Sequence, residues 1–260
     1  MSCCPPGSLP ALEIDSYAAK GAEIDLPGVE GLKAYVIGEE GKPAVIVNYD
    51  VFGFGRPAPE VGGGRVREVC DLLAASGLYV VLPDYYRGDN VVKAGKADSG
   101  EAIFGWIAEF GVADTEAVVK ASVSFCQSKG AAKIGAIGFC WGGWLCMRSA
   151  SSPEIDLSCI VLLHAAPGAE GVVGGSAEAL CDTVKLPTLN LPSNQEPPEV
   201  LPGGLFEKKM GEKGIEYECV YFEDMAHGWV TRGDMADANT ARDVPKAIEL
   251  TKAFLHKHLK

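Results

Sequence analysis

The sequence lacks the positive charge that a nucleic-acid-binding protein needs. It holds 23 Lys and Arg against 35 Asp and Glu, so its formal net charge is −12 at pH 7. Binding to a phosphate backbone requires a field of the opposite sign. The charge balance therefore argues against DNA or RNA as the main partner.

Long apolar runs are missing as well. No run approaches the roughly 20 residues that a helix needs to cross a bilayer. The N-terminal stretch MSCCPPGSLPAL has neither the basic nor the apolar region of a secretory signal. We therefore expect a cytoplasmic protein with no membrane partner. Hydrophobic residues (47%) and charged residues (22%) are close to globular averages, which excludes wholesale disorder.

Cysteine is plentiful, but the spacings that would make it structural are absent. There are nine cysteines and no C-x-x-C pair. An odd number, mostly inside apolar segments such as SFCQS and LSCIVLL, argues against a disulfide framework and for a reducing cytosol. His256 and His258 lie in a lysine-rich C-terminal segment, so no structural zinc site is expected.

Nucleotide-binding motifs are also absent. No G-K-[ST] occurs, and the glycines within 53–55 and 62–64 do not complete G-x-G-x-x-G after a strand. We expect neither a metal nor an organic cofactor.

Short apolar runs alternate with segments of helical period along most of the chain. The pattern predicts strands at 33–37, 43–53, 78–84, 133–139, 158–164, 185–192 and 215–222, and helices at 65–76, 115–129, after 140, near 203–213 and at 236–259. Such alternation indicates an α/β fold with a mostly parallel sheet and helices on both faces. Residues 1–30, rich in Pro and Gly, are expected to form an irregular arm, and residues 31–260 a single domain.

A nucleophile candidate stands at the end of the strand 133–139. There the chain reads GFCWGG (138–143) and continues into a helix, the setting of a nucleophile elbow with Cys140 where Ser is more usual. Glycines two residues before and after Cys140 let strand and helix approach closely. The helix N-terminus favours a thiolate, and the N–H of Trp141 can face an oxyanion. The alternative is a buried structural cysteine beside packing glycines.

Only four histidines are available as a base. His256 and His258 in the last helix are expected to be solvated. His164 ends a predicted strand, where it either lines the site or is a satisfied core-edge histidine. His227 follows the strand 215–222 and precedes the closing helix. A hydrolase with a nucleophile elbow places its base at this point of the chain.

The order nucleophile, acid, base places the acid between Cys140 and His227, after the strand 185–192. That loop reads SNQEPPE and contains no Asp. Glu196 is the first choice, with Glu199 and Asn194 as alternatives, because each can accept the imidazole N–H.

Further polar residues close neighbouring strands. Asp50 follows the second apolar strand, where it can bond to the thiol, pair with an arginine or simply begin a turn. The N–H of Val51 is the expected second oxyanion donor. Arg87 and Arg232 follow other strands, where either can clamp a carboxylate substrate or form surface salt bridges.

Together these residues resemble the dienelactone hydrolases, or carboxymethylenebutenolidases. The matching pieces are NYDVFGF, YVVLPDYYRGD, IGAIGFCWGG and AHGWVTR, and the resemblance runs from about residue 30 to the end. The MSCCPPG start looks like that of eukaryotic members. The resemblance implies an α/β-hydrolase fold with a Cys, Asp, His triad that opens enol-lactones and often cleaves simple esters.

Carried over residue by residue, the resemblance makes Cys140 the nucleophile and His227 the base. Asp50 stands where the family has an acidic residue, usually Glu, that contacts the nucleophile. Arg232, and Arg87 with a shift of one residue, fall near the family's carboxylate-binding arginines.

The triad acid is where the chain departs from the family, because Glu196 stands where the Asp is expected. The main hypothesis is a monomeric thiol hydrolase of small lactones or esters. The departure motivates an alternative, a degenerate member that binds ligands or senses redox state with little turnover. Some plant relatives carry glucanase-type names. A glycosidase needs two carboxylates facing one cleft, and Asp50 with Glu196 is the one pair the sequence offers.

Overall fold

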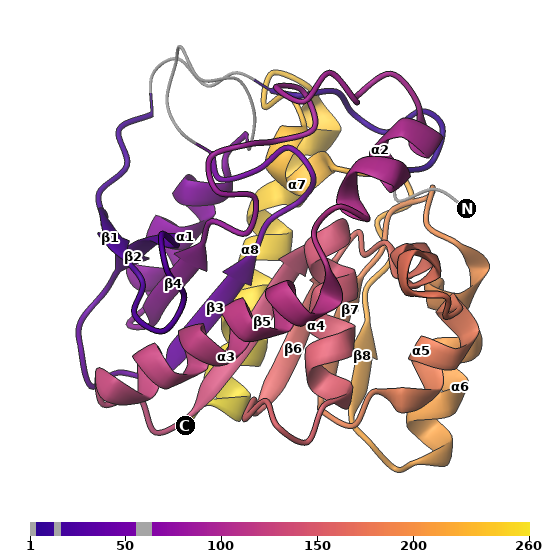
Figure 1. Ribbon diagram of the computed structural model, residues 1–260. Coiled ribbons are helices and arrows are strands. Elements are labelled where there is room, and N and C mark those ends of the chain that lie inside the picture. The colour runs from indigo at the N-terminus through magenta and orange to yellow at the C-terminus, as the bar shows by residue number, and fades with distance from the viewer. Residues whose placement is uncertain (1–3, 13–16, 56–63) are drawn as a thin grey trace.

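The computed structural model of the protein describes residues 4–12, 17–55 and 64–260. One eight-stranded sheet runs through it in the order β1-β2-β4-β3-β5-β6-β7-β8 (Figure 1). The strands are β1 (Ala22–Asp25), β2 (Lys33–Ile37), β3 (Ala44–Asn48), β4 (Tyr79–Pro83), β5 (Ile134–Phe139), β6 (Cys159–Leu163), β7 (Thr188–Leu191) and β8 (Tyr217–Cys219). The pairs β1–β2 and β2–β4 are antiparallel, and all the others are parallel.

Helices cover both faces of the sheet. Helices α3 and α4 pack on one face, and α1 and α8 pack on the other (Figure 1). The helices are α1 (Val66–Ala74), α2 (Gly100–Ile107), α3 (Val112–Ser128), α4 (Trp141–Ser151), α5 (Ala177–Thr183), α6 (Leu205–Glu212), α7 (Trp229–Arg232) and α8 (Ala238–His258), with 3₁₀ turns η1 (Pro167–Val173) and η2 (Pro198–Val200). The predicted α/β architecture is confirmed. No helix among the described residues is long and apolar enough to span a bilayer.

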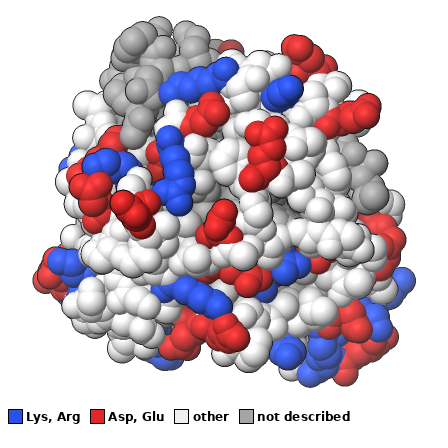
Figure 2. Space-filling model, viewed as in Figure 1, with Lys and Arg blue, Asp and Glu red and all other residues white. Residues whose placement is uncertain are grey.

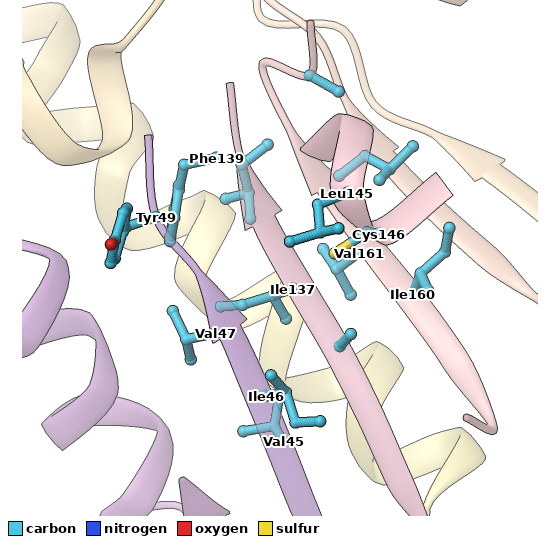
Figure 3. Close-up of a cluster of buried hydrophobic side chains, with 14 of the residues drawn as sticks. Val45, Ile46, Val47, Tyr49, Ile137, Phe139, Leu145, Cys146, Ile160 and Val161 are labelled. Atoms are coloured by element: carbon cyan, nitrogen blue, oxygen red, sulfur yellow. The ribbon is translucent and has the colours of Figure 1, made fainter. Parts of the chain in front are cut away.

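The central strands explain why the sheet must be covered on both sides. All residues of β3, β5 and β6 are buried. Figure 3 shows Val45, Ile137 and Val161 among the apolar side chains of these strands, with Leu145 of α4 packed against them. An uninterrupted apolar strand can remove all its side chains from water only between two layers of helices.

The N-terminal arm differs from its prediction. Residues 22–25 form β1, which pairs with β2 at the edge of the sheet, with Ala22 opposite Val36. Its residues are exposed or half-buried, so the sequence carries no apolar alternation that would reveal a strand. The arm is therefore not irregular throughout.

Several short elements are not predicted from the sequence, or are shorter in the structure than the prediction. Helices α2 and α5 were missed, although each begins after a serine, Ser99 or Ser176, whose side chain caps the first turn. Strand β8 covers three residues of the predicted 215–222. On the face shown in Figure 2, acidic and basic side chains are interspersed, with no continuous basic patch.

The junction of β5 with α4 is the tightest packing point in this part of the fold. A Cβ atom added to Gly142 would lie 2.1 Å from the carbonyl oxygen of Asn48, in β3. One added to Gly138 would lie 2.1 Å from the carbonyl oxygen of Gly142. Because these neighbours are backbone atoms, they cannot swing aside as a flexible side chain does.

This close approach predicts a strong effect of Gly142→Ala. We expect it to lower the free energy of unfolding by at least about 3 kcal/mol, since overpacking against backbone must separate α4 from β3. Gly105→Ala in α2 is the matched control, because an added Cβ there meets nothing within 4 Å. It should stabilise the protein by about 0.5–1 kcal/mol through better helix propensity. Urea denaturation of both variants tests the pair, and equal stabilities would contradict it.

Candidate active site

Cys140 lies at the junction of β5 and α4 in a strained backbone conformation, with φ 54° and ψ −115°. A non-glycine residue with positive φ costs about 1–3 kcal/mol and persists only where its surroundings hold it. Here the Cys140 N–H donates to the carbonyl oxygen of Leu163 at 3.2 Å, and the Ala166 N–H donates to the Cys140 carbonyl at 2.9 Å. Strand β6 and its following loop therefore fix the turn. The side chain is fully buried.

Two backbone N–H groups, near the start of α4 and after the end of β3, have no acceptor among the described residues. Trp141 is the first residue of α4, so its N–H has no partner within the helix. The contact of Gly142 with Asn48 brings the start of α4 against the end of β3, just before Val51. Neither the Trp141 nor the Val51 N–H donates a hydrogen bond to another described residue. Both stay available to an acceptor.

Glu196 and His227 form a buried pair, with 2.7 Å between Glu196 Oε1 and His227 Nδ1. Their side chains are at most 1% exposed. Two neighbours fix the pair. The Ser193 hydroxyl donates to Glu196 Oε2 at 2.5 Å, and the His227 N–H donates to Gln195 Oε1 at 2.9 Å. The sequence did not identify these two positioning residues.

Parallel strand pairing brings the two loops together. The segments that follow β7 and β8 continue side by side, with a parallel β-bridge between Ser193 and Phe222. Of the two alternative acids, Asn194 donates its amide to the Glu223 carbonyl at 2.8 Å and lies exposed, while Glu199 lies half-exposed in η2. The structure pairs Glu196, and neither alternative, with His227.

The environment of His227 keeps its ring charged. Burial by itself lowers its pKa, but the adjacent Cys4 sulfur and the Glu196 carboxylate outweigh burial and raise the pKa to about 9. His164 behaves in the opposite way, because burial and the positive charges of His227 and Arg232 hold its pKa well below the usual range.

His164 lies beside the base and is not satisfied, contrary to the simpler of its two sequence interpretations. Its ring centroid is 5.1 Å from that of His227, and its two ring nitrogens are buried with no hydrogen-bond partner among the described residues. His256 and His258 are half-buried in α8 and bond to Ser76 and Glu216, so they lie outside the site but are less solvated than expected.

A cysteine that the sequence did not single out completes the cluster. Cys4 Sγ lies 3.8 Å from Cys140 Sγ. One ligand atom from each of Cys4, Cys140 and His227 lies within 4.8 Å of the other two. No signal in the local sequence marks Cys4, because its place depends on the arm folding back over a residue 136 positions away. These three are the side chains of the described residues that could together hold a soft metal ion.

Asp50 lies beside this cluster as part of a buried ion pair with Arg232. Asp50 also accepts from the Thr231 hydroxyl and from the Phe52 N–H, both at 2.9 Å. Two of the interpretations that the sequence allowed are therefore met: Asp50 pairs with an arginine, and it also begins a turn in which the Gly53 N–H donates to its carbonyl at 3.0 Å. Gly228, with φ 93°, makes room for the Arg232 guanidinium, since a Cβ on Gly228 would lie 2.1 Å from Arg232 Nη2.

The two predicted arginines differ. Arg232 is 3% exposed, donates from Nε to the Leu9 carbonyl at 3.0 Å, and has Nη2 buried with no hydrogen-bond partner among the described residues. Arg87 is exposed and donates to the Glu30 carbonyl at 2.8 Å, in the turn before β2. Only Arg232 lies beside Asp50 with a donor to spare.

A cavity of about 560 Å³ opens next to the cluster. It is bounded by the arm on one side and by the segment leading into α2 on the other, and its lining includes Cys4, Gly7, Leu9, Phe52, Asp98 and Ile103. Cys4 therefore separates this cavity from Cys140.

Comparison with known proteins finds relatives that align with most of the chain. The chain is 26% identical to a carboxymethylenebutenolidase homolog of Mus musculus, over 83% of the chain and 82% of the mouse protein. It is 30% identical to an endo-1,3;1,4-beta-D-glucanase of Zea mays over 52% of the chain, which spans 40% of the maize protein.

Among solved structures, that of a putative dienelactone hydrolase from Klebsiella pneumoniae superposes with a TM-score of 0.68 and 19% identity, covering 91% of this chain and 99% of the other. This likeness shows the α/β-hydrolase fold. Residues 32–259 match the dienelactone hydrolase family. The chain therefore belongs to the dienelactone hydrolase family and, as a member of it, is a hydrolase.

Proposed function

We propose that the protein is a thiol hydrolase that cleaves small esters or lactones through an acyl-enzyme on Cys140. The observation that carries the proposal is that Glu196, His227 and Cys140 lie together, with a carboxylate on Nδ1 of a buried imidazole and the Cys140 sulfur within 4.8 Å of a ring nitrogen. Nucleophile, base and orienting acid in this relation are the requirements of covalent acyl transfer.

The mechanism follows from the charges. The imidazolium of His227 and the N-terminus of α4 favour the thiolate of Cys140. The thiolate attacks the substrate carbonyl, and the N–H groups of Val51 and Trp141 hold the oxyanion that develops. His227 then gives its proton to the leaving oxygen. Neutral His227 next accepts a proton from the water that hydrolyses the acyl-enzyme, which regenerates the imidazolium and the thiolate.

Glu196 replaces the Asp of the family without loss of the required contact. It accepts the Nδ1–H of His227 and stabilises the imidazolium, while Ser193 holds its second oxygen. This support weighs against the alternative, a degenerate family member with little turnover, which the missing Asp suggested.

The polar groups around the site favour a substrate that carries a carboxylate. Arg232 Nη2 is a buried donor with no partner among the described residues, and its guanidinium also lies 4.2 Å from the Phe52 ring, which lines the cavity. A carboxylate would satisfy that donor. Arg87 does not share this position, so we assign substrate binding to Arg232 alone.

A glycosidase activity is not supported. It needs two carboxylates free to face one cleft. Asp50 is tied to Arg232 and Thr231, and Glu196 is tied to His227 and Ser193. Neither has the freedom to protonate a glycosidic oxygen, so the similarity to part of the maize glucanase gives no reason to propose that chemistry here.

We also propose a cytoplasmic monomer. Every cysteine among the described residues is a free thiol, which suits a reducing compartment. The exposed large hydrophobic residues Leu72, Val173, Tyr221 and Met235 lie in four different parts of the chain, and they offer no evident dimer surface.

The thiol mechanism predicts distinct losses on substitution. Cys140→Ala and His227→Ala should each lower kcat for p-nitrophenyl acetate by about 10³-fold or more, and Glu196→Gln by about 10–10³-fold, because the last loses only the orienting charge. Cys219→Ser in β8 is the control and should retain wild-type turnover. Steady-state kinetics decide, and activity that survives Cys140→Ala would rule out the mechanism.

The role of Arg232 predicts a change of preference. Arg232→Lys should lower kcat/KM for a carboxylated enol-lactone by about 10–100-fold relative to p-nitrophenyl acetate, since it keeps the charge but loses the second donor. Arg87→Lys should leave the ratio unchanged. The ratio between the two substrates removes any general effect on stability, and an unchanged ratio for Arg232→Lys would contradict the assignment.

The raised pKa of His227 predicts a pH-dependent stability. Folded His227 has a pKa of about 9 against 6.5 in the unfolded chain, so its contribution is fully present below pH 6.5 and is lost as the pH rises through 9. The difference in unfolding free energy between wild type and Glu196→Gln should be about 1–3 kcal/mol at pH 6 and should shrink toward pH 9.5. Urea titrations across this range test it. A difference that grows with pH would show that Glu196 does not stabilise an imidazolium.

A further inference from the structure

The first described residues of the chain lie directly over the proposed nucleophile. We call residues 4–9 the strap. Its Cys4 is 9% exposed, while Cys140 beneath it is fully buried. The two sulfur atoms are 3.8 Å apart, which is a direct contact. The proposed hydrolytic mechanism gives Cys4 no covalent step, although its sulfur helps to raise the pKa of His227, and in this position it occupies space that an acyl group on Cys140 would need.

Specific contacts hold the strap in place. The Leu9 N–H donates to the His227 carbonyl at 2.9 Å, and the Leu9 carbonyl accepts from Arg232 Nε at 3.0 Å. Between these contacts and Cys4 the chain makes a turn, in which the Ser8 N–H and hydroxyl donate to the Pro5 carbonyl at 3.1 and 2.6 Å. The strap is thus anchored on the base and on the substrate arginine, and the turn returns Cys4 to Cys140.

Small molecules can reach this pair. Cys4 lines the cavity of about 560 Å³, and the strap forms one of its walls. A molecule in the cavity meets Cys4 first and Cys140 directly behind it. A small reagent in the cavity therefore lies next to the pair, and a short movement of the strap uncovers Cys140, which has no exposed surface while the strap is in place.

We propose that Cys4 and Cys140 are the site of a reversible disulfide that fastens the strap over the nucleophile and stops hydrolysis. The loss of hydrolysis rests on the proposed function, whereas the cross-link itself does not. Closing the bond requires the sulfurs to move from 3.8 Å to about 2 Å apart. Cys4 belongs to a short segment outside helices and strands, so the strap can supply this movement without displacing β5 or α4.

A hydroperoxide is the oxidant by chemical class. The Cys140 thiolate attacks the terminal peroxide oxygen, so an S–O bond forms, the O–O bond breaks and the alkoxide or hydroxide leaves with a proton. Cys4 then attacks the sulfenic sulfur, so the S–S bond forms and hydroxide leaves as water. The two thiols supply the two electrons that reduce the peroxide. A dithiol reverses the step by exchange.

The other described cysteines are poor competitors. Burial raises the pKa of four of these thiols to about 12, namely Cys126, Cys146, Cys159 and Cys181. It raises that of Cys70 further, and it also raises that of half-buried Cys219. Thiols with such a raised pKa are almost entirely protonated at neutral pH and therefore react slowly. Cys140, by contrast, has a helix N-terminus and an imidazolium beside it.

Peroxide treatment of the full-length protein tests the proposal. Wild type exposed to hydrogen peroxide should yield a Cys4–Cys140 peptide in a non-reducing digest. Its hydrolysis of p-nitrophenyl acetate should fall at least about tenfold, and dithiothreitol should restore it. Cys4→Ser should give no cross-link and, relative to its own untreated rate, should lose activity that dithiothreitol does not restore, because Cys140 then oxidises further. Cys3→Ser, a change outside the described residues, is the matched control and should behave as wild type.

The disulfide and the hydrolytic function can be contradicted independently. A wild-type protein that forms the cross-link but never hydrolyses an ester would overturn the proposed function and leave the disulfide standing. Cys140 oxidised without a partner, or joined to Cys3, would overturn the disulfide. So would thiols that stay unreactive until a chelator removes zinc, since the pair would then be a metal site.

Discussion

The fold depends on the strained turn at Cys140. A cysteine with φ 54° is held only if the strand before it and the helix after it are fastened from several sides. Three glycines make this possible. Gly138, Gly142 and Gly143 lie so close to Gly142, Asn48 and Ala165 respectively that any side chain would collide. The same close approach that accompanies the strain places the start of α4 against the end of β3, so the strained turn and the packing of α4 on β3 have one origin.

The acid and the base depend on strand pairing in the same way. Strands β7 and β8 are short, but their pairing continues into the loops as the bridge from Ser193 to Phe222. Glu196 and His227 therefore lie on adjacent loops whose backbones are already in register. A Glu is one methylene longer than an Asp, and the hydroxyl of Ser193 holds its second oxygen. The longer side chain is accommodated by fixing both oxygens, one on the imidazole and one on the hydroxyl.

Much of this arrangement could be predicted from the sequence, for identifiable reasons. Strands buried on both faces read as apolar runs, and the elbow needs glycines at fixed positions, so β3, β5 and Cys140 were all located. The order of nucleophile, acid and base in the chain singled out His227 and placed Glu196 first among the possible acids. Every one of these predictions rests on local spacing or on chain order.

Features that depend on distant contacts could not be predicted. Strand β1 has no apolar alternation, because it is an exposed edge that is held by hydrogen bonds to β2. Arg87 follows a strand as expected, yet its side chain points to the Glu30 turn, and one residue of offset is enough to turn it away. Cys4 is the clearest case. Nothing around it in the sequence indicates that a turn at Pro5–Ser8 and a bond from Leu9 to the base will carry it to Cys140.

The strap also changes how the burial of the site should be understood. A fully buried nucleophile usually reflects a tight pocket, but here part of the covering is a segment outside helices and strands, with hydrogen bonds at Leu9 and a contact between Cys4 and Cys140. A segment of this kind opens at lower free energy than the sheet beneath it. The two anchors are the His227 carbonyl and Arg232 Nε, which belong to the proposed base and to the proposed substrate-binding arginine. A substrate that draws Arg232 toward its carboxylate therefore loosens the strap at the moment when Cys140 must be uncovered, whereas a bond between Cys4 and Cys140 removes that freedom altogether.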